Sequence, residues 1–194
     1  MNKYTDTYYS LIKEYKEMHE KGINNLRPES TFQGSSLFKH IFSLREIIIK
    51  KGISSLIDFG CGKAIFYKNK LPYKIKGKTG EFTIQEFWNV KDIVLYDPGV
   101  KEFELYPKQK KDLVICTDVL EHIPMIDTEN FLNDIYLLAN KAVFFAVSVR
   151  ESKKKLKSGQ SVHINIRKED EWDKIFNSFQ KRYPDITTYY NLEN

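Results

Sequence analysis

Acidic, glycine and histidine residues follow three apolar runs of the sequence. They occupy Asp58–Gly62, Asp97 and Asp118–His122. Each apolar run is short and reads as a buried strand. Since ligands of parallel sheets bind beyond the carboxyl ends of the strands, residues at three such ends should meet in one cleft. Carboxylates accept hydrogen bonds from hydroxyl and ammonium groups, so this cleft should take a polar ligand.

Closely spaced glycines occupy the first of these ends, at Gly60 and Gly62 on either side of Cys61. Glycine lets the backbone turn sharply and lets a ligand approach it. The dinucleotide pattern G-x-G-x-x-G would need a third glycine at position 65, where the chain has Ile65. A nicotinamide-dependent dehydrogenase is therefore disfavoured. A plain turn between a strand and a helix remains an alternative for the glycines.

The second strand end carries Asp97, which can accept hydrogen bonds from both hydroxyls of a ribose. It follows Asp58 by 39 residues, whereas the usual offset in dinucleotide folds is about 20. The excess is the lysine-rich stretch after residue 62, which reads as an insertion. The alternative is a turn aspartate, since Asp97 precedes Pro98 and Gly99.

Taken together and in this order, the three motifs resemble the class I S-adenosylmethionine-dependent methyltransferases. The resemblance consists of D-F-G-C-G-K at Asp58–Lys63, Y-D-P at Tyr96–Pro98 and D-V-L-E-H-I-P at Asp118–Pro124. It covers roughly Leu56 to Val149, about half of the chain. The sequence departs from the family pattern at Ala64, where a third glycine is common.

This resemblance implies S-adenosylmethionine as cofactor and S-adenosylhomocysteine as product. The glycine loop would pass close to the methionine part, and Asp58 would hold its amino group directly or through water. Asp97 would bind the ribose hydroxyls, and the stretch Cys116–Asp118 would lie near the adenine and methionine ends. The short segment from Asp97 to Asp112 leaves the adenine pocket unassigned. The implied cofactor-binding residues are Asp58, Gly60, Cys61, Gly62, Asp97, Pro98, Cys116, Thr117 and Asp118.

Three residues are candidate general bases for methyl transfer to oxygen or nitrogen: Glu121, His122 and His163. The alternative for His122 is a histidine at a helix start that is bonded to the backbone, and for His163 an ordinary loop histidine. Ser148 and Arg150 follow the strongest apolar run and could hold an anionic group of the substrate. The histidines and cysteines have no metal-ligand spacing, so the sequence predicts no metal site.

The elements that position these residues alternate between strand and helix patterns, which predicts an α/β fold. We expect a Rossmann-like, mostly parallel sheet with helices on both faces. Residues 1–194 should form a single methyltransferase domain, with a helical extension at 1–51 and the core at 52–194. The extension should act as a lid, although packing against the sheet is an alternative. Its candidate lid contacts are Tyr8, Tyr15, Phe32 and Gly34.

Several segments carry clear patterns. Helices are expected over Leu37–Lys50, with Ser35 or Ser36 as its cap, and over Thr128–Asn140 and Lys168–Lys181. Ala142–Val149 is the strongest strand, and Phe103–Tyr106 alternates like a short one.

Composition supports a folded globular protein. Of 194 residues, 41% are hydrophobic, which is enough for a buried core, and the net charge of +5 permits an anionic partner without requiring one. No apolar run approaches the roughly 18–20 residues that span a bilayer. The absence of a signal-peptide pattern and the two scattered cysteines predict a cytoplasmic protein with reduced thiols.

The acceptor predicted from this small size is a cleft-sized metabolite or saccharide, which could be anionic. Lysine clusters at Lys63–Lys78 and Arg150–Lys157 leave an RNA methyltransferase as one alternative. Another is a non-catalytic S-adenosylmethionine-binding partner protein. Nucleic acid is the less favoured ligand because no RNA-binding module is visible.

Overall fold

The computed structural model describes residues 3–23, 26–75 and 78–194, and a five-stranded sheet forms its centre. The strand order is β4-β1-β5-β6-β7, and every neighbouring pair is parallel. This confirms the expected Rossmann-like α/β fold. The strands are β1 (Ser55–Phe59), β4 (Asp92–Tyr96), β5 (Lys111–Thr117), β6 (Ala139–Ser148) and β7 (Thr187–Glu193).

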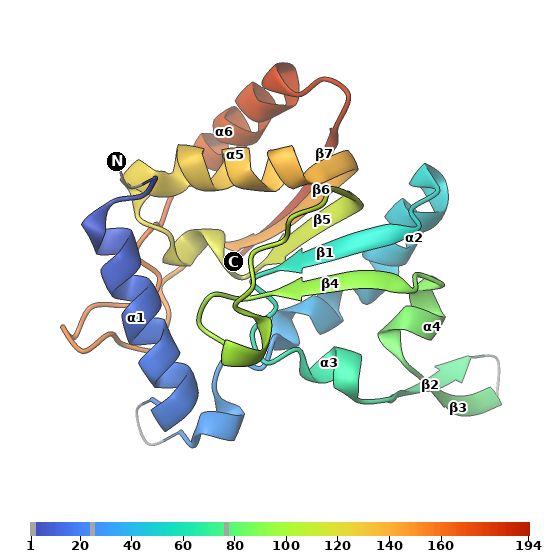
Figure 1. The fold of residues 1–194 in the computed structure, drawn as a ribbon, viewed down its shortest axis with the longest axis horizontal. Coiled ribbons are helices and arrows are strands. Elements are labelled where there is room, and N and C mark those ends of the chain that lie inside the picture. Colours follow the sequence, from blue (N-terminus) through green and yellow to red (C-terminus); the bar gives the residue numbers. More distant parts are fainter. Residues whose placement is uncertain (1–2, 24–25, 76–77) are drawn as a thin grey trace.

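Helices cover both faces of this sheet (Figure 1). The pair α5 and α6 packs on one face, and α2 and α4 pack on the other. Helix α1 lies beyond the tips of β1 and β4, toward which their arrows point (Figure 1). The helices are α1 (Asp6–Lys21), α2 (Ile41–Lys51), α3 (Ile65–Lys68), α4 (Ile84–Trp88), α5 (Thr128–Leu138) and α6 (Glu169–Arg182).

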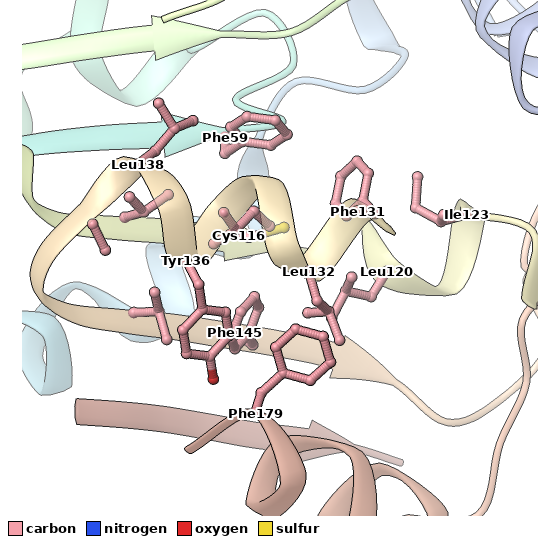
Figure 2. Packing of buried hydrophobic residues seen from close by; sticks show 14 of the residues in the cluster. Phe59, Cys116, Leu120, Ile123, Phe131, Leu132, Tyr136, Leu138, Phe145 and Phe179 are labelled. Carbon is pink, nitrogen blue, oxygen red and sulfur yellow. The ribbon is translucent and has the colours of Figure 1, made fainter. Parts of the chain in front are cut away.

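Strand alternation decides which side chains face which helix layer. Phe59 and Cys116 pack with α5 on one face, among the aromatic side chains drawn in Figure 2. Leu56 packs with α2 on the other face. Because Asp58 is two residues from Leu56, it also points toward the α2 side, away from the α5 core.

The lysine-rich insertion after the glycine loop contains α3, α4 and a small antiparallel hairpin of β2 (Leu71–Ile75) and β3 (Lys78–Phe82). The side chains of Lys74, Lys76 and Lys78 lie outside the described part. The hairpin sits away from the central sheet (Figure 1), so the insertion lengthens the chain between β1 and β4 without changing their pairing.

Two local predictions were wrong. Phe103–Tyr106 is not a strand, because the carbonyl of Phe103 accepts a hydrogen bond from the Asp97 amide (3.0 Å) and Leu105 is exposed to solvent. The helix expected over Leu37–Lys50 begins as a 3₁₀ helix at Ser35–His40 before α2. Gly34, in a left-handed conformation, precedes it, and neither serine caps it through its side chain.

No helix in the described residues is both long and apolar enough to cross a bilayer.

Candidate active site

A cleft opens at the carboxyl edge of the sheet, between the strand ends and α1. The predicted residues at this cleft are Gly60, Gly62, Asp97, Pro98, Thr117, Asp118 and His122. The predicted lid contacts Tyr8, Tyr15, Phe32 and Gly34 line it as well. The fold therefore brings the ends of β1, β4 and β5 to one place, and the N-terminal extension forms the opposite wall.

Asp97 organises the floor of this cleft. Its carboxylate accepts one hydrogen bond from the Gly62 amide (2.9 Å) and another from the Gly99 amide (2.8 Å). Burial raises the pKa of Asp97, and these two backbone hydrogen bonds oppose the rise. One side chain thus ties the glycine loop to the turn that follows β4.

The segment after α1 packs tightly onto the glycine loop. Lys63 donates its amide hydrogen to the Phe32 carbonyl (3.0 Å), and Ile65 donates to the Gln33 carbonyl (3.3 Å). Gly62 has a φ of +56°, and a Cβ atom there would stand 2.4 Å from the Phe32 carbonyl oxygen. Glycine at position 62 is therefore needed both for its left-handed backbone and for this close approach.

Asp58 lies beneath the loop, not on the cleft surface. Its side chain is fully buried beside Tyr67, and its Oδ1 atom has no hydrogen-bond partner among the residues that the structure describes. Burial raises the pKa of Asp58 to about 7, although Tyr67 partly lowers it. A buried carboxyl with an unpaired oxygen is suited to a cationic ligand group that reaches it through the loop.

This buried carboxyl makes a testable contribution to stability. The folded-state pKa of about 7 exceeds the ordinary aspartate pKa of 3.8, so folding becomes less favourable as pH rises between these values. In cofactor-free protein, Asp58→Asn should therefore gain stability relative to wild type by about 2–3 kcal/mol between pH 5 and pH 8. Urea unfolding at both pH values measures this difference.

The control is Asp185→Asn, which changes an exposed carboxyl that faces solvent and should show no such pH dependence. A stability difference between Asp58→Asn and wild type that stays constant from pH 5 to pH 8 would mean that Asp58 is ionised at its ordinary pKa.

The two cysteines belong to the core. Cys61 and Cys116 are free thiols, both buried, and burial raises the pKa of each. The Cys116 side chain points into the α5 face of the sheet (Figure 2), so it does not line the cleft as its neighbours Thr117 and Asp118 do. The strand alternation of β5 explains the difference, since successive side chains point to opposite faces.

The sequence left two interpretations open for His122, a general base at the cleft and a histidine bonded to the backbone, and the structure has features of both. Its Nδ1 atom lies 2.9 Å from the Val162 carbonyl oxygen, with the Tyr15 hydroxyl at 3.4 Å. Because a carbonyl only accepts, Nδ1 carries the hydrogen and the lone pair lies on Nε2. Burial, with His163 next in importance, lowers the pKa of His122 to about 4. The ring is thus bonded to the backbone and also lines the cleft.

Glu121 lies deeper than His122 and is fully buried. Its Oε1 atom accepts a hydrogen bond from the Ser148 amide (2.9 Å). Burial and the adjacent Asp118 carboxylate raise the pKa of Glu121 well above its usual range. Burial is the largest single effect on Asp118 and opposes its ionisation, but the neighbouring Glu121, His122 and His163 together outweigh it and lower the pKa of Asp118.

The residues proposed for the substrate are placed differently from the expectation. Ser148 is buried and holds Glu121 through its amide, while the Arg150 side chain is exposed. The Arg150 carbonyl lies 2.7 Å from Nδ1 of His163. Neither Ser148 nor Arg150 lines the cleft. They position Glu121 and His163 instead.

Sequence reasoning missed His19 and Lys154, which both line the cleft. His19 belongs to α1 and is buried. It stacks near Phe32, with ring centroids 4.9 Å apart, and burial lowers its pKa to about 4. The Lys154 ammonium lies 4.5 Å from the Phe32 ring centroid. The resemblance of the N-terminal segment to a lid could have pointed to His19, one turn after Tyr15 on α1.

Comparison with known proteins agrees with this geometry. A family model described as a methyltransferase domain matches residues 18–182. No curated protein and no solved structure matches the chain. The matched range includes the glycine loop, Asp97 and the Asp118–His122 segment, and proteins of this family use S-adenosylmethionine as methyl donor. The chain therefore belongs to the class I S-adenosylmethionine-dependent methyltransferases.

Proposed function

We propose that this enzyme methylates an oxygen or nitrogen atom of a small metabolite or saccharide unit that carries an anionic group. The observation that carries the proposal is the placement of His122 in the cleft, with its Nε2 lone pair left available by the hydrogen bond at Nδ1. The predicted substrate contacts Ser148 and Arg150 have no place in this proposal, because they lie away from the cleft.

The residues at the cleft fit the cofactor. The glycine loop leaves a surface of backbone without side chains, and the unpaired Oδ1 of Asp58 is suited to an ammonium group. Asp97 would bind the ribose hydroxyls beside the amides that it already accepts. When bound, S-adenosylmethionine supplies an electrophilic methyl group on its sulfonium. The protein then has to orient the acceptor and take up its proton.

We assign to His122 the uptake of the proton that the methyl acceptor loses. A neutral imidazole with a free Nε2 lone pair can accept a proton from an acceptor hydroxyl or ammonium. Tyr15 and Val162 fix the ring orientation through Nδ1. His163, the other candidate histidine, packs edge-on against His122 at a centroid distance of 4.9 Å but does not line the cleft.

Charge and shape of the cleft support a small, anionic acceptor. Tyr8, Tyr15 and Phe32 wall the opening, and Lys154 places a cation above Phe32. Three other lysines of the two clusters, Lys63, Lys68 and Lys157, contact other groups of the protein, Lys68 through an ion pair with Glu102. Lys63 donates to the carbonyls of His19 and Pro28, and Lys157 pairs with Glu17. These engaged lysines are a weaker basis for an RNA-binding surface than their number in the sequence suggested.

Transfer of a labelled methyl group from S-adenosylmethionine into fractionated extract of the source cell tests the acceptor class. We expect label in small molecules or glycan. Label in a polymer that ribonuclease removes would contradict the proposal and establish an RNA acceptor. No transfer into any fraction by folded enzyme that binds S-adenosylhomocysteine would instead support the non-catalytic alternative.

With the identified acceptor, His122→Ala should lower kcat by about 100-fold or more, since general base catalysis typically contributes 10²–10⁴. Affinity for S-adenosylhomocysteine should change less than about threefold in calorimetry. Tyr15→Phe is the matched control: it removes the 3.4 Å contact to the ring and a 3.2 Å hydrogen bond to the Val162 carbonyl but leaves the imidazole in place, so kcat should change far less. If His122→Ala keeps turnover within threefold of wild type, the proton leaves by another route.

A further inference from the structure

We propose that Asp118, Glu121 and His163 form a binding site for one divalent transition-metal ion, of the Mn²⁺, Fe²⁺ or Zn²⁺ type. One ligand atom from each of the three side chains lies within 4.8 Å of the others. The sequence predicted no metal site because His163 stands far from the other two along the chain. The fold brings it to them.

Backbone hydrogen bonds hold the two contributing segments together. Asp118 and Glu121 follow β5, whereas His163 belongs to the loop that follows β6. The amides of Ile164 and Asn165 both donate to the Glu121 carbonyl, at 2.9 and 3.0 Å. The loop is thus fixed directly onto the residue that supplies the central carboxyl, so the juxtaposition is built into the fold.

Glu121 provides a second, independent sign of a ligand. Its side chain is fully buried, and while Oε1 is satisfied by the Ser148 amide, Oε2 has no hydrogen-bond donor among the described residues. A buried carboxylate oxygen without a donor is unfavourable unless a cation or proton meets it. The unpartnered Oε2 belongs to the same cluster as Asp118 and His163.

The histidine is prepared for the same role. Nδ1 of His163 lies 2.7 Å from the Arg150 carbonyl oxygen, so Nδ1 is the donor and the lone pair lies on Nε2. Metal-ligating histidines usually donate their other ring hydrogen to a carbonyl or carboxylate in this way. Ser148 and Arg150, which the sequence suggested for the substrate, thereby act as the outer support of the three ligands.

The donor set selects the class of ion. Two carboxylates and one imidazole suit Mn²⁺, Fe²⁺ or Zn²⁺, whereas Mg²⁺ and Ca²⁺ favour oxygen donors alone. Ligand atoms around one such ion stand roughly 3.0–3.4 Å apart at bond lengths of about 2.1 Å. Side-chain rotations that move each ligand atom by about an ångström would therefore close this cluster around an ion.

Three protein ligands leave coordination positions open, and Asp118 places them at the cleft. An oxygen of the methyl acceptor could take one of these positions and be polarised there. This second step rests on the proposed function, whereas the metal site itself does not depend on which acceptor is used.

Titration of the chelator-treated full-length protein with Mn²⁺, followed by electron paramagnetic resonance, tests the site without cofactor or acceptor. We expect one ion per chain, displaced by Zn²⁺. His163→Ala should weaken Mn²⁺ binding at least tenfold while leaving Mg²⁺ binding nearly unchanged. Glu121→Gln keeps an oxygen for the Ser148 amide, so it should remain folded, and should also weaken binding at least tenfold. Asp185→Asn, at an exposed carboxyl, is the control.

Absence of stoichiometric Mn²⁺ and Zn²⁺ binding, or binding that both His163→Ala and Glu121→Gln leave intact, would overturn the metal site. Because these measurements contain no acceptor, they are independent of the methylation assay. A protein that binds the ion but methylates only RNA would contradict the proposed acceptor and leave the metal site standing.

Discussion

Asp97→Ala is expected to weaken binding of S-adenosylhomocysteine by about 100-fold or more, measured by calorimetry. The variant removes the carboxylate that we assign to the ribose hydroxyls, and hydrogen bonds to a charged group contribute about 1.5–3 kcal/mol each. Two such bonds correspond to at least about 100-fold in affinity, since 1.4 kcal/mol is a factor of ten. The variant also releases the amides of Gly62 and Gly99 that the carboxylate now accepts.

Asp92→Ala is the matched control for this experiment. Asp92 is the same residue type and begins strand β4, whereas Asp97 follows the other end of that strand, and Asp92 pairs with Lys111 near the surface. Exposed ion pairs contribute little, so cofactor affinity should stay within about twofold. Asp97→Asn separates the two losses, because the amide keeps one acceptor oxygen for a backbone donor. Wild-type affinity in Asp97→Ala would exclude Asp97 from the cofactor site.

The carboxyl ends of β1, β4 and β5 could be predicted from sequence because each apolar run ends in a residue that a core would not hold. Asp58, Asp97 and Asp118 mark those ends, and parallel pairing then determines that they meet. The register of β1 with β4, in which Asp58 is opposite Leu95, and with β5, in which it is opposite Ile115, realises this. The order of the three motifs in the sequence therefore predicted the position of the site at the carboxyl edge of the sheet.

Side-chain direction was harder to predict. Cys116 and Thr117 are neighbours, yet one points into the α5 core and the other lines the cleft. Ser148 likewise ends a strand but lies below the cleft surface. If a strand ends one residue earlier or later, a side chain that would line the cleft points into the core instead. The end of a strand is hard to locate in a continuous apolar run such as that of β6.

Contacts made by the irregular loop after β6 could not be predicted from the sequence. His163 reaches Asp118 and Glu121 only because its loop is bonded to the Glu121 backbone. Lys154 lies over the Phe32 ring, although the two residues are far apart in the sequence. No local pattern encodes such pairings, since they depend on how a loop without regular structure folds back over α1.

The packing of the N-terminal extension on the glycine loop leads to the last prediction. Gly62 and Gly52 have nearly the same backbone conformation, with φ of +56° and +58°. A Cβ atom at Gly52 would meet none of the described residues within 4 Å, whereas one at Gly62 would lie 2.4 Å from the Phe32 carbonyl oxygen. Gly52→Ala should therefore lower the free energy of unfolding by only about 1–2 kcal/mol, which is the strain of an alanine in a left-handed conformation.

Gly62→Ala should lose that amount and also displace residues 32–34, which breaks the hydrogen bond from the Lys63 amide to Phe32. We expect a total loss of about 3 kcal/mol in urea unfolding. Affinity for S-adenosylhomocysteine should fall at least tenfold in Gly62→Ala and remain at the wild-type value in Gly52→Ala. Equal losses of stability and equal affinities in the two variants would show that the extension does not hold the loop. The expected difference would instead make the N-terminal segment a structural part of the cofactor site, because its backbone then fixes the loop that the cofactor must approach.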